Sequence, residues 1–340
     1  MGHGAESGKS EQQTEAALYH GRPEEAWQSA RHSAKSGSAP RSHPRASGRP
    51  ANGNPDIRIT TGCGADGKPE HEQGARVSDT LQYAIGDDHI ARITLDRPTA
   101  CNAFDDVMIA ELTACLAGLS QNSDLRALIL SATGRHFCAG LDYQWLLRAS
   151  SHDQHRNFEE ALTLSRLMQL LDRFPVPTIA RVQGPAFGMG LGLIACCDLV
   201  VAHQDAYFQL SEVRLGLVPA VTAPYIQSKI GVSGARRYFL TAEPIDCRRA
   251  HALGLIHEVA ETEAELEQWV TRWLDAIVQN GPRAMLAAKR LVAAIEHRPI
   301  DDALLSDIAH RIAHLRARAE AQEGVAAHVA GRPPRWHEAD

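Results

Sequence analysis

PTIARVQGPAFGMGLGLIACCDLVVAHQDAYFQLSE, residues 177–212, is the most informative stretch of the sequence. Its β-branched, apolar beginning, Thr178–Val182, predicts a buried strand, and Leu199–His203 predicts a second one. Between them a glycine-rich turn leads into an apolar helical segment, Leu191–Cys197. A strand, a glycine-rich turn and a helix N-terminus leave unpaired backbone N–H groups directed at one point. We therefore expect this turn to hold an anion or a developing oxyanion.

Glu212 closes this stretch as a lone carboxylate in otherwise apolar company. Its position after a buried strand and before an apolar turn suggests a role in proton transfer. The simpler alternative is a surface glutamate that caps a helix or pairs with Arg214, because most glutamates lie on protein surfaces. Our working hypothesis is that the chain holds an oxygen at the glycine-rich turn and moves a proton with Glu212.

A second turn of small residues, HFCAGLD (His136–Asp142), follows another predicted buried strand, Leu125–Ala132. Glycine in a single turn is usually present for positive φ or for close packing. Two such turns, each followed by a helix-like stretch, allow two N–H donors to converge from separate segments. A polarised carbonyl requires that arrangement, because charge develops on one oxygen in the transition state.

The glycines of Gly188–Gly192 also permit a dinucleotide-binding interpretation, in which Asp205 would contact a ribose. Against it, Leu193 is a poor fit for the third small residue of that motif, and Gly184 and Pro185 separate the strand from it. A dehydrogenase therefore stays an alternative, and binding of NAD would distinguish it.

The composition is that of an ordinary globular protein: 340 residues, of which 44% are hydrophobic and 22% charged. The net charge of −6 gives no reason to expect nucleic acid or a membrane as a partner, and no apolar run is long enough to span a bilayer. Seven cysteines, an odd number without CxxC spacing, predict free thiols in a cytoplasmic protein and no metal site.

Three regions are predicted along the chain. Residues 1–78 are dense in Gly, Ser, Pro, His and charged residues and are predicted to be a disordered extension. Residues 79–260 alternate strands with helices, and residues 261–340 have helical spacing throughout, which together predict an α/β core with a C-terminal helical layer. The elements expected outside the stretch quoted above are a hairpin (Leu81–Ile85 and Ile90–Leu95) and helices over Phe104–Leu119, Phe158–Phe174, Tyr225–Ile230, Ala235–Leu240, Cys247–Leu253, Leu266–Val278, Arg283–Glu296 and Asp301–Ala327.

Several motifs, in the same order and at the same distances, resemble the enoyl-CoA hydratase/isomerase (crotonase) superfamily over about residues 81–327. The resemblance rests on LDRPTACNAF (95–104), GRHFCAGLD (134–142), VPTIARVQGPAFGMGLGLIACCDLVVA (176–202), SEVRLGLVP (211–219) and the run 250–256. It implies a crotonase-type ββα spiral core (79–260) with a C-terminal helical trimerisation region (261–340). It also implies an acyl-CoA substrate, no separate cofactor because coenzyme A is part of that substrate, and self-association as a homotrimer or hexamer.

The resemblance also assigns roles to individual residues. Leu141 and Met189 would supply the two oxyanion-hole N–H groups, and Glu212 would be the catalytic acid/base. Ala103 would line the adenine pocket, and Arg97 and Lys289, the latter from this chain or a neighbouring subunit, would face the CoA phosphates. The full set expected to bind the substrate is Arg97, Ala103, Ala139, Tyr143, Gly188, Gly192 and Lys289.

Three departures from the family pattern bear on the reaction. Gly192 stands where hydratases of the family have their first catalytic glutamate, Met189 replaces the middle oxyanion glycine, and Thr99 and Gln144 replace lysines near the CoA phosphates. A positioned acid or base is worth roughly 10²–10⁴ in rate, so the loss of one carboxylate is a serious handicap for hydration.

The sequences around Glu212, over 236–243 and over 251–259, are most similar to bacterial hydratases of branched or carboxylated enoyl-CoAs, such as methylglutaconyl-CoA. Our prediction is therefore an enoyl-CoA hydratase-type enzyme with a single acid/base. A Δ3,Δ2-enoyl-CoA isomerase, which needs only one base, is the first alternative. A non-catalytic CoA-binding scaffold is the second.

Overall fold

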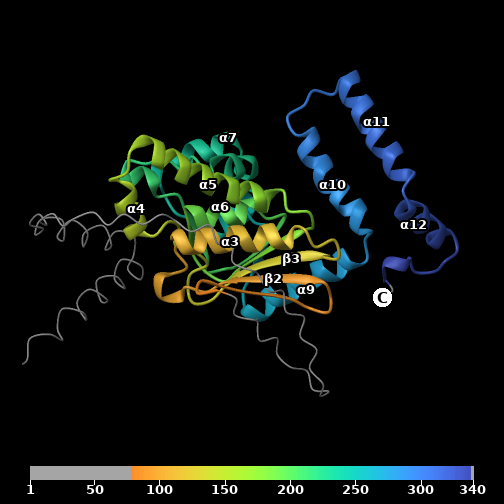
Figure 1. Ribbon diagram of the computed structural model, residues 1–340, viewed down its shortest axis with the longest axis horizontal. Helices are drawn as coiled ribbons and strands as arrows, with labels where there is room; N and C mark the ends of the chain where they lie inside the picture. The colour runs from red at the N-terminus through yellow and green to blue at the C-terminus, as the bar shows by residue number, and fades with distance from the viewer. Residues whose placement is uncertain (1–77, 338–340) are drawn as a thin grey trace, which may run out of the picture. The chain divides into compact units, whose positions relative to one another are not determined.

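The computed structural model describes residues 78–337. The predicted disordered extension lies outside this range except for its last residue. The largest sheet has six strands in the order β1-β2-β3-β4-β6-β9, with β1 antiparallel to β2 and all other neighbours parallel (Figure 1). The strands are β1 (Leu81–Ile85), β2 (Ile90–Leu95), β3 (Ala127–Ala132), β4 (Thr178–Val182), β6 (Leu199–His203) and β9 (Glu258–Ala260).

Helices cover both faces of this sheet, with α3 (Asp106–Leu119) and α9 (Glu263–Val278) on opposite sides of β2 and β3 (Figure 1). Successive side chains of a strand point to opposite faces. In β3, Leu128 and Leu130 accordingly join the main core under α3, whereas Ile129 joins the smaller core under α9. Two further helices enclose the main core. Helix α5 (Gln154–Asp172) packs against α3, and α6 (Met189–Cys196) packs against α5.

A second, smaller sheet was not predicted, and it positions the candidate site. It consists of β5 (Ala186–Phe187), β7 (Tyr207–Gln209) and β8 (Ile245–Asp246). Two isolated bridges extend it, Cys138 with Ala186 and Phe104 with Leu141, both parallel. Segments of two or three residues are too short to show the alternation of a strand, so only their tertiary pairing reveals them.

The α/β core predicted for residues 79–260 contains three further helices and two 3₁₀ turns. These are η1 (Pro98–Ala100), α4 (Tyr143–Ala149), η2 (Glu212–Leu215), α7 (Ala223–Thr241) and α8 (Cys247–Ala252). The two short helices expected over residues 225–240 are joined in α7 across a kink at Gly231, where φ is 70°. The hairpin β1–β2 and the strands β4 and β6 have the predicted bounds.

The C-terminal region contains α10 (Pro282–Ile295), α11 (Asp302–Arg316), α12 (Ala319–Val329) and η3 (Arg335–His337). The prediction of one continuous helix over Asp301–Ala327 is wrong. Arg318 has an extended backbone between α11 and α12, and the Glu320 carboxylate then accepts the N–H groups of Arg283 and Ala284 at the start of α10. A tertiary contact therefore interrupts a segment whose local pattern favours one helix.

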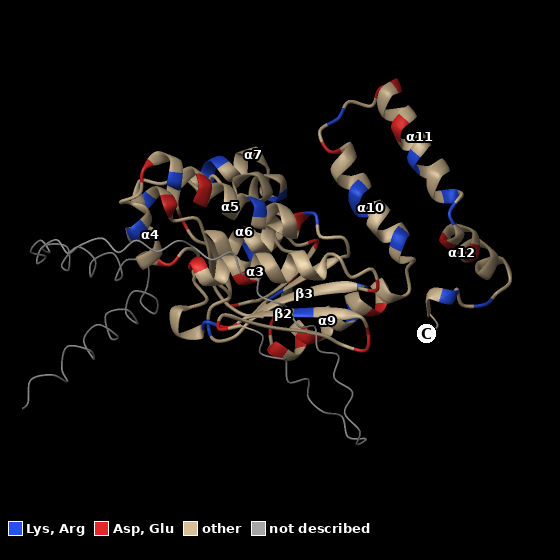
Figure 2. Ribbon diagram, viewed as in Figure 1, with Lys and Arg blue, Asp and Glu red and all other residues tan. Residues whose placement is uncertain are grey.

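The C-terminal region is tied to the sheet by Arg126, the residue before β3. Its guanidinium donates to the carbonyls of Val278, Asn280 and Trp336. Acidic and basic residues both occur along α11 (Figure 2). None of the helices within residues 78–337 combines the length and the apolar character that a membrane span requires.

Candidate active site

The two glycine-containing turns lie side by side. Phe137 donates its N–H to the Pro185 carbonyl at 2.9 Å, and Phe187 donates its N–H to the Cys138 carbonyl at 2.9 Å. The turns then meet at their glycines, because a Cβ placed on Gly140 would lie 3.1 Å from the Phe187 carbonyl oxygen and 3.8 Å from Gly188 Cα. The two turns that the sequence pairs are therefore neighbours in the structure.

The Leu141 N–H is directed away from its own bridge. Phe104 donates to the Gly140 carbonyl at 2.7 Å and accepts from the Asp142 N–H at 2.9 Å. In a parallel pairing this pattern uses the groups on either side of Leu141 and turns the N–H of Leu141 to the opposite edge. No acceptor for this N–H occurs among residues 78–337, so it is available to a ligand.

The Met189 N–H lies at the first residue of α6, where a helix has no internal acceptor. Gly188 precedes it with φ 47° and ψ −112°, a backbone conformation that residues other than glycine rarely adopt. Gly188 donates its own N–H to the Gln209 carbonyl at 3.0 Å, which fixes the turn to β7. Met189 itself is buried, so its side chain is accommodated in the core.

Cys138 fills the space between the two donor segments. Its Sγ accepts the Gly140 N–H at 3.4 Å, and a Cβ on Gly190 would lie only 2.6 Å from the Cys138 Cβ. Burial raises the pKa of the Cys138 thiol to about 12, so it is neutral near pH 7 and unsuited to act as a nucleophile. Cys138 therefore contributes spacing between the two turns rather than covalent chemistry.

Glu212 is the first residue of η2, and its carboxyl lies against the same glycine turn. A Cβ on Gly188 would be 2.9 Å from Glu212 Oε1. The Oε2 atom is buried and has no hydrogen-bond partner among the described residues. Arg214 donates to the Ala242 carbonyl at 2.9 Å and forms no ion pair with Glu212, contrary to the simpler alternative considered from the sequence.

Burial raises the pKa of Glu212 above the ordinary 4.5, with a smaller opposing effect from its own backbone N–H. Desolvation disfavours the charged carboxylate because no cation or further donor compensates for the lost water. A carboxyl whose pKa is raised in this way is a suitable acid/base near neutral pH.

Gly192 lies one helical turn after Gly188, to which it donates at 3.0 Å. A Cβ here would lie 2.3 Å from Thr222 Cγ2 and 3.2 Å from Met168 Sδ. The position is therefore closed by side chains of the protein itself.

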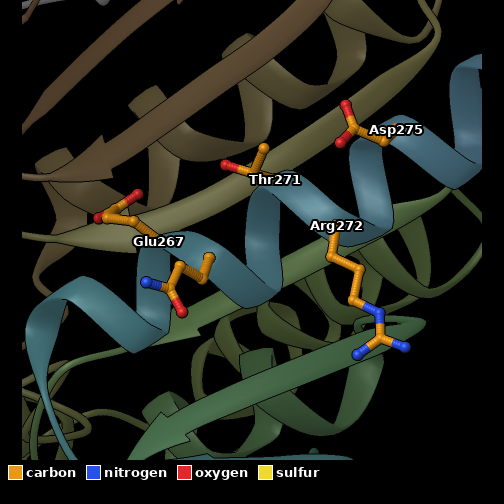
Figure 3. A pocket seen from close by; sticks show the side chains of 5 residues that line it. Glu267, Thr271, Arg272 and Asp275 are labelled. Carbon is orange, nitrogen blue, oxygen red and sulfur yellow. The ribbon is translucent and has the colours of Figure 1, made fainter.

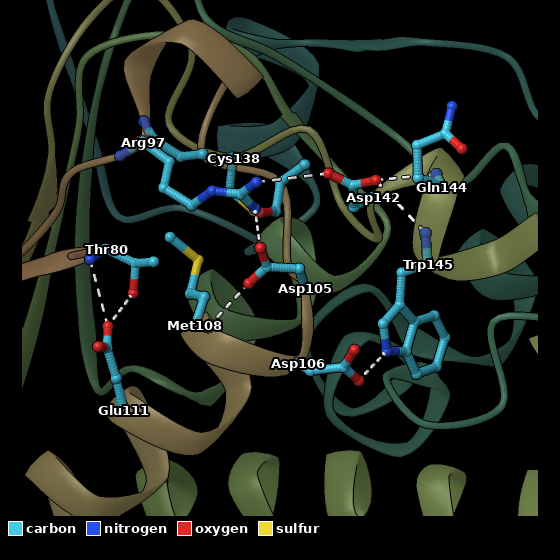
Figure 4. A network of polar contacts seen from close by, with 12 residues as sticks. Thr80, Arg97, Asp105, Asp106, Met108, Glu111, Cys138, Asp142, Gln144 and Trp145 are labelled. Atoms are coloured by element: carbon cyan, nitrogen blue, oxygen red, sulfur yellow. Dashed lines mark hydrogen bonds and ion pairs between the residues drawn. The ribbon is translucent and has the colours of Figure 1, made fainter. Parts of the chain in front are cut away.

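Arg97 and Asp142 belong to a polar network next to Leu141 (Figure 4). The Asp142 carboxylate accepts the Gln144 N–H at 2.8 Å and the Trp145 N–H at 3.4 Å, and so caps α4. Arg97 lies 3.6 Å from Asp142 and 3.1 Å from Asp105, counted between charged atoms. This network holds the chain rigidly on the C-terminal side of the Leu141 donor.

Comparison with known proteins agrees with this geometry. Residues 86–339 match the family described as enoyl-CoA hydratase/isomerase. The chain belongs to this family. It is similar to a Thermus thermophilus protein assigned as an enoyl-CoA hydratase, 30% identical over 249 residues that span 73% of this chain and 97% of that protein. A peroxisomal Delta(3,5)-Delta(2,4)-dienoyl-CoA isomerase of Arabidopsis thaliana is 28% identical over 74% of this chain and 93% of its own length.

Among solved structures, an enoyl-CoA hydratase from Shewanella pealeana shares 40% identity and a TM-score of 0.73, with coverage of 76% of this chain and 96% of that one. The fold is thus the crotonase fold, with mixed sheets and C-terminal helices. The protein is an enzyme of the enoyl-CoA hydratase family, and its substrate class is the acyl-CoA thioesters of that family.

Two residues predicted to bind CoA are used structurally in this crotonase. Ala103 is fully buried and its carbonyl accepts from Arg97, and its place in the adenine pocket stays a prediction. Lys289 of α10 donates to Asp198 at 2.7 Å, beside the start of β4 and β6, whereas the site lies beyond the other end of β4. Within one chain, Lys289 therefore does not join the candidate site.

The remaining predicted residues lie near the donors. Ala139 donates its N–H to the Cys101 carbonyl at 2.9 Å and is partly exposed. Tyr143 begins α4 and is 43% exposed. Arg97 lies within ion-pair distance of Asp105 and Asp142, and its role at the CoA phosphates stays a prediction.

A shallow groove of about 390 Å³ on α9 is a separate feature of the crotonase surface (Figure 3). It is lined by Glu267, Gln268, Thr271, Arg272 and Asp275, all of which belong to α9. In residues 78–337 no three His, Cys, Asp or Glu side chains are grouped so as to hold a metal ion.

Sequence reasoning did not assign roles to Cys138, Thr222 or Met168. Cys138 lies inside the quoted HFCAGLD motif, so its position beside the donor was visible although its packing was not. Thr222 and Met168 are 30 and 24 residues from Gly192 along the chain, and no local pattern connects them with it.

Proposed function

We propose that the protein is an enoyl-CoA hydratase-type enzyme that uses an oxyanion hole and a single acid/base, Glu212. The observation that supports this most strongly is the Glu212 carboxyl, buried without an ion-pair partner beside the glycine turn that precedes the Met189 N–H. The thioester carbonyl oxygen would accept from the N–H groups of Leu141 and Met189. These donors would stabilise the negative charge that develops on that oxygen.

In the hydration step, the C=C π bond of the enoyl thioester opens as a water oxygen bonds to Cβ. Glu212 takes a proton from that water and supplies one to Cα, so the carboxyl returns to its starting state. One carboxylate would then perform both transfers, through its two oxygens, and its raised pKa matches that double role.

Migration of a double bond is the second candidate. Here Glu212 would take the proton from Cα of a 3-enoyl thioester and return it at Cγ, with no water consumed. The closed position at Gly192 favours this candidate, because the described structure leaves Glu212 without a second carboxylate to share the work. A CoA-binding scaffold without turnover is the third.

The three candidates predict different products from the same enzyme. Crotonyl-CoA, 3-methylglutaconyl-CoA and a 3-enoyl-CoA should be assayed in parallel for water addition and for double-bond migration. We expect water addition, fastest with a branched or carboxylated enoyl-CoA. Migration without hydration would contradict the first proposal, and binding of all three without turnover would indicate the scaffold.

We further propose that the helical region 261–340 mediates trimer or hexamer formation, with 79–260 as the catalytic core. Apolar side chains of the C-terminal region are strongly exposed in the single chain, among them Val292 (66%), Val325 (67%) and Val329 (81%) on helices and Ile300 (87%) between α10 and α11. Burial of such a surface favours association. Light scattering should give a trimer or hexamer, and a monomer at micromolar concentration would contradict the proposal.

Six buried cysteines in the described range have free thiols, which supports a reducing, cytoplasmic location. Fractionation of cells that express the tagged protein tests this.

A further inference from the structure

Thr222 packs against α6 one turn after Gly188, the glycine that the Glu212 carboxyl contacts. Gly188 is the N-cap of this helix and Gly192 lies one turn later, where its N–H donates to the Gly188 carbonyl at 3.0 Å, so the two positions are neighbours at the start of α6. The Glu212 carboxyl rests on Gly188, and the Thr222 methyl group rests on Gly192. A residue at 192 with a longer side chain would therefore project beside the Glu212 carboxyl.

The contact between Thr222 and Gly192 leaves no room for a Cβ. Besides the 2.3 Å distance to Thr222 Cγ2, a Cβ would lie 3.0 Å from Thr222 Cβ. Thr222 is 2% exposed, and its hydroxyl donates to the Pro219 carbonyl at 3.3 Å. It precedes α7 but makes no side-chain capping bond to it, so its methyl group is free to serve as packing against α6.

Met168 closes the same position from α5. Its Sδ would lie 3.2 Å from a Cβ at 192 and is 3.9 Å from the Cys196 Sγ, one further turn along α6. Met168 is fully buried. A methionine can shift to admit a new group, whereas a β-branched threonine next to backbone has little freedom.

We propose that Thr222 is a specificity-determining residue that closes position 192 to a second acid/base and so restricts the enzyme to reactions that Glu212 performs alone. The proposal rests on the proposed role of Glu212. It explains by packing why position 192 is glycine. It also means that Thr222, 30 residues away in the sequence, determines which reactions the enzyme can catalyse.

The packing part is tested by a double-mutant cycle in thermal stability. Gly192→Ala should lower the Tm by roughly 2–10 °C, the range expected for overpacking by one carbon in a domain of this size. Thr222→Ser removes the methyl group and keeps the hydroxyl, so the double variant should recover at least half of that loss. The control is Gly118→Ala in α3, where a Cβ meets nothing within 4 Å, and its Tm should not fall. Additive Tm changes in the cycle would overturn the proposal.

The catalytic part is tested by placing a carboxylate at 192 with and without room for it. The variants are Gly192→Glu, Thr222→Gly and the double variant Gly192→Glu/Thr222→Gly, assayed for hydration of crotonyl-CoA. The double variant should hydrate at least about 10-fold faster than either single variant, the low end of what one acid/base contributes. Equal gain from Gly192→Glu alone would overturn the proposal, as would a folded double variant without gain.

Failure of this proposal is distinguishable from failure of the proposed function. Glu212→Gln in the unmodified chain tests the function, whereas the Tm cycle needs no substrate. An inactive Glu212→Gln variant together with an additive cycle would leave the function standing and remove Thr222 from it.

Discussion

Replacing Gly188 by alanine perturbs the site at the point where all its parts meet. The new methyl group would lie 2.9 Å from Glu212 Oε1, 3.7 Å from its Cδ and 3.8 Å from Gly140 Cα. A carbon and an oxygen at 2.9 Å overlap, so the Glu212 carboxyl must move by several tenths of an ångström or more. The Met189 N–H, on the next residue, would move with the strained backbone.

The size of the effect follows from two contributions. Alanine at φ 47° and ψ −112° costs about 1–3 kcal/mol of backbone strain, which corresponds to a Tm loss of roughly 2–12 °C. A displacement of about 1 Å in a reacting group can cost 10²-fold in rate. We therefore expect kcat to fall about 10- to 100-fold while KM changes less, because the acyl-CoA binding surface outside the turn stays intact.

The matched control is Gly231→Ala in α7. Gly231 also has a positive φ, 70° with ψ 166°, but a Cβ there meets nothing within 4 Å. It should lose stability to a similar extent and keep kcat within about 3-fold at a temperature well below its Tm, since it moves no group of the site. Steady-state kinetics and differential scanning calorimetry on both variants decide the matter. Equal loss of kcat in the two variants, or full activity in Gly188→Ala, would refute the placement of the acid/base beside this turn.

Three other predictions follow from the site. Because burial raises the pKa of Glu212, its protonation stabilises the folded state, and this stabilisation is lost as the pH rises from 4.5 through the raised pKa. The Tm of Glu212→Gln minus that of wild type should therefore be larger at pH 8 than at pH 4. The same Tm difference at both pH values would contradict the raised pKa. Cys138→Ser should keep most of the activity, whereas Cys138→Val, which adds bulk against Gly190, should lower kcat more than it raises KM; equal kinetics would show that Cys138 does not set the donor spacing. Lys289→Met should lower the Tm because the ion pair with Asp198 is lost, and the KM for acyl-CoA should not change. A raised KM would show that Lys289 binds the substrate.

The order of the large elements could be predicted because their residues are periodic or uniformly apolar. Thr178–Val182 and Leu199–His203 have the expected bounds, since each is a short β-branched run between clear breaks. The helix α6 begins at Met189, two residues before the predicted start. The prediction began too late because glycine, present at 190 and 192, has a low helix propensity. Those glycines are held in the helix by close packing against Cys138 and Thr222, which no local pattern contains.

The candidate site could be predicted in part for the same reason. Leu141 and Met189 follow turns that the sequence makes visible, and the structure leaves both N–H groups without a protein acceptor in the described range. The pairing of Lys289 with Asp198 could not be predicted, because it joins residues 91 positions apart. The break between α11 and α12 depends on the capping contact of Glu320 with α10, which is equally non-local.

The most direct measurement is solvent deuterium incorporation into the acyl chain of the thioester by wild type and Glu212→Gln, with thioester affinity measured alongside. Glu159→Gln, a change of the same kind at an exposed position of α5, serves as the control. If Glu212 alone transfers the proton, Glu212→Gln should bind the thioester within about 3-fold of wild type and lose at least 10²-fold in exchange and turnover. Turnover and exchange within 10-fold of wild type in Glu212→Gln would contradict the assignment.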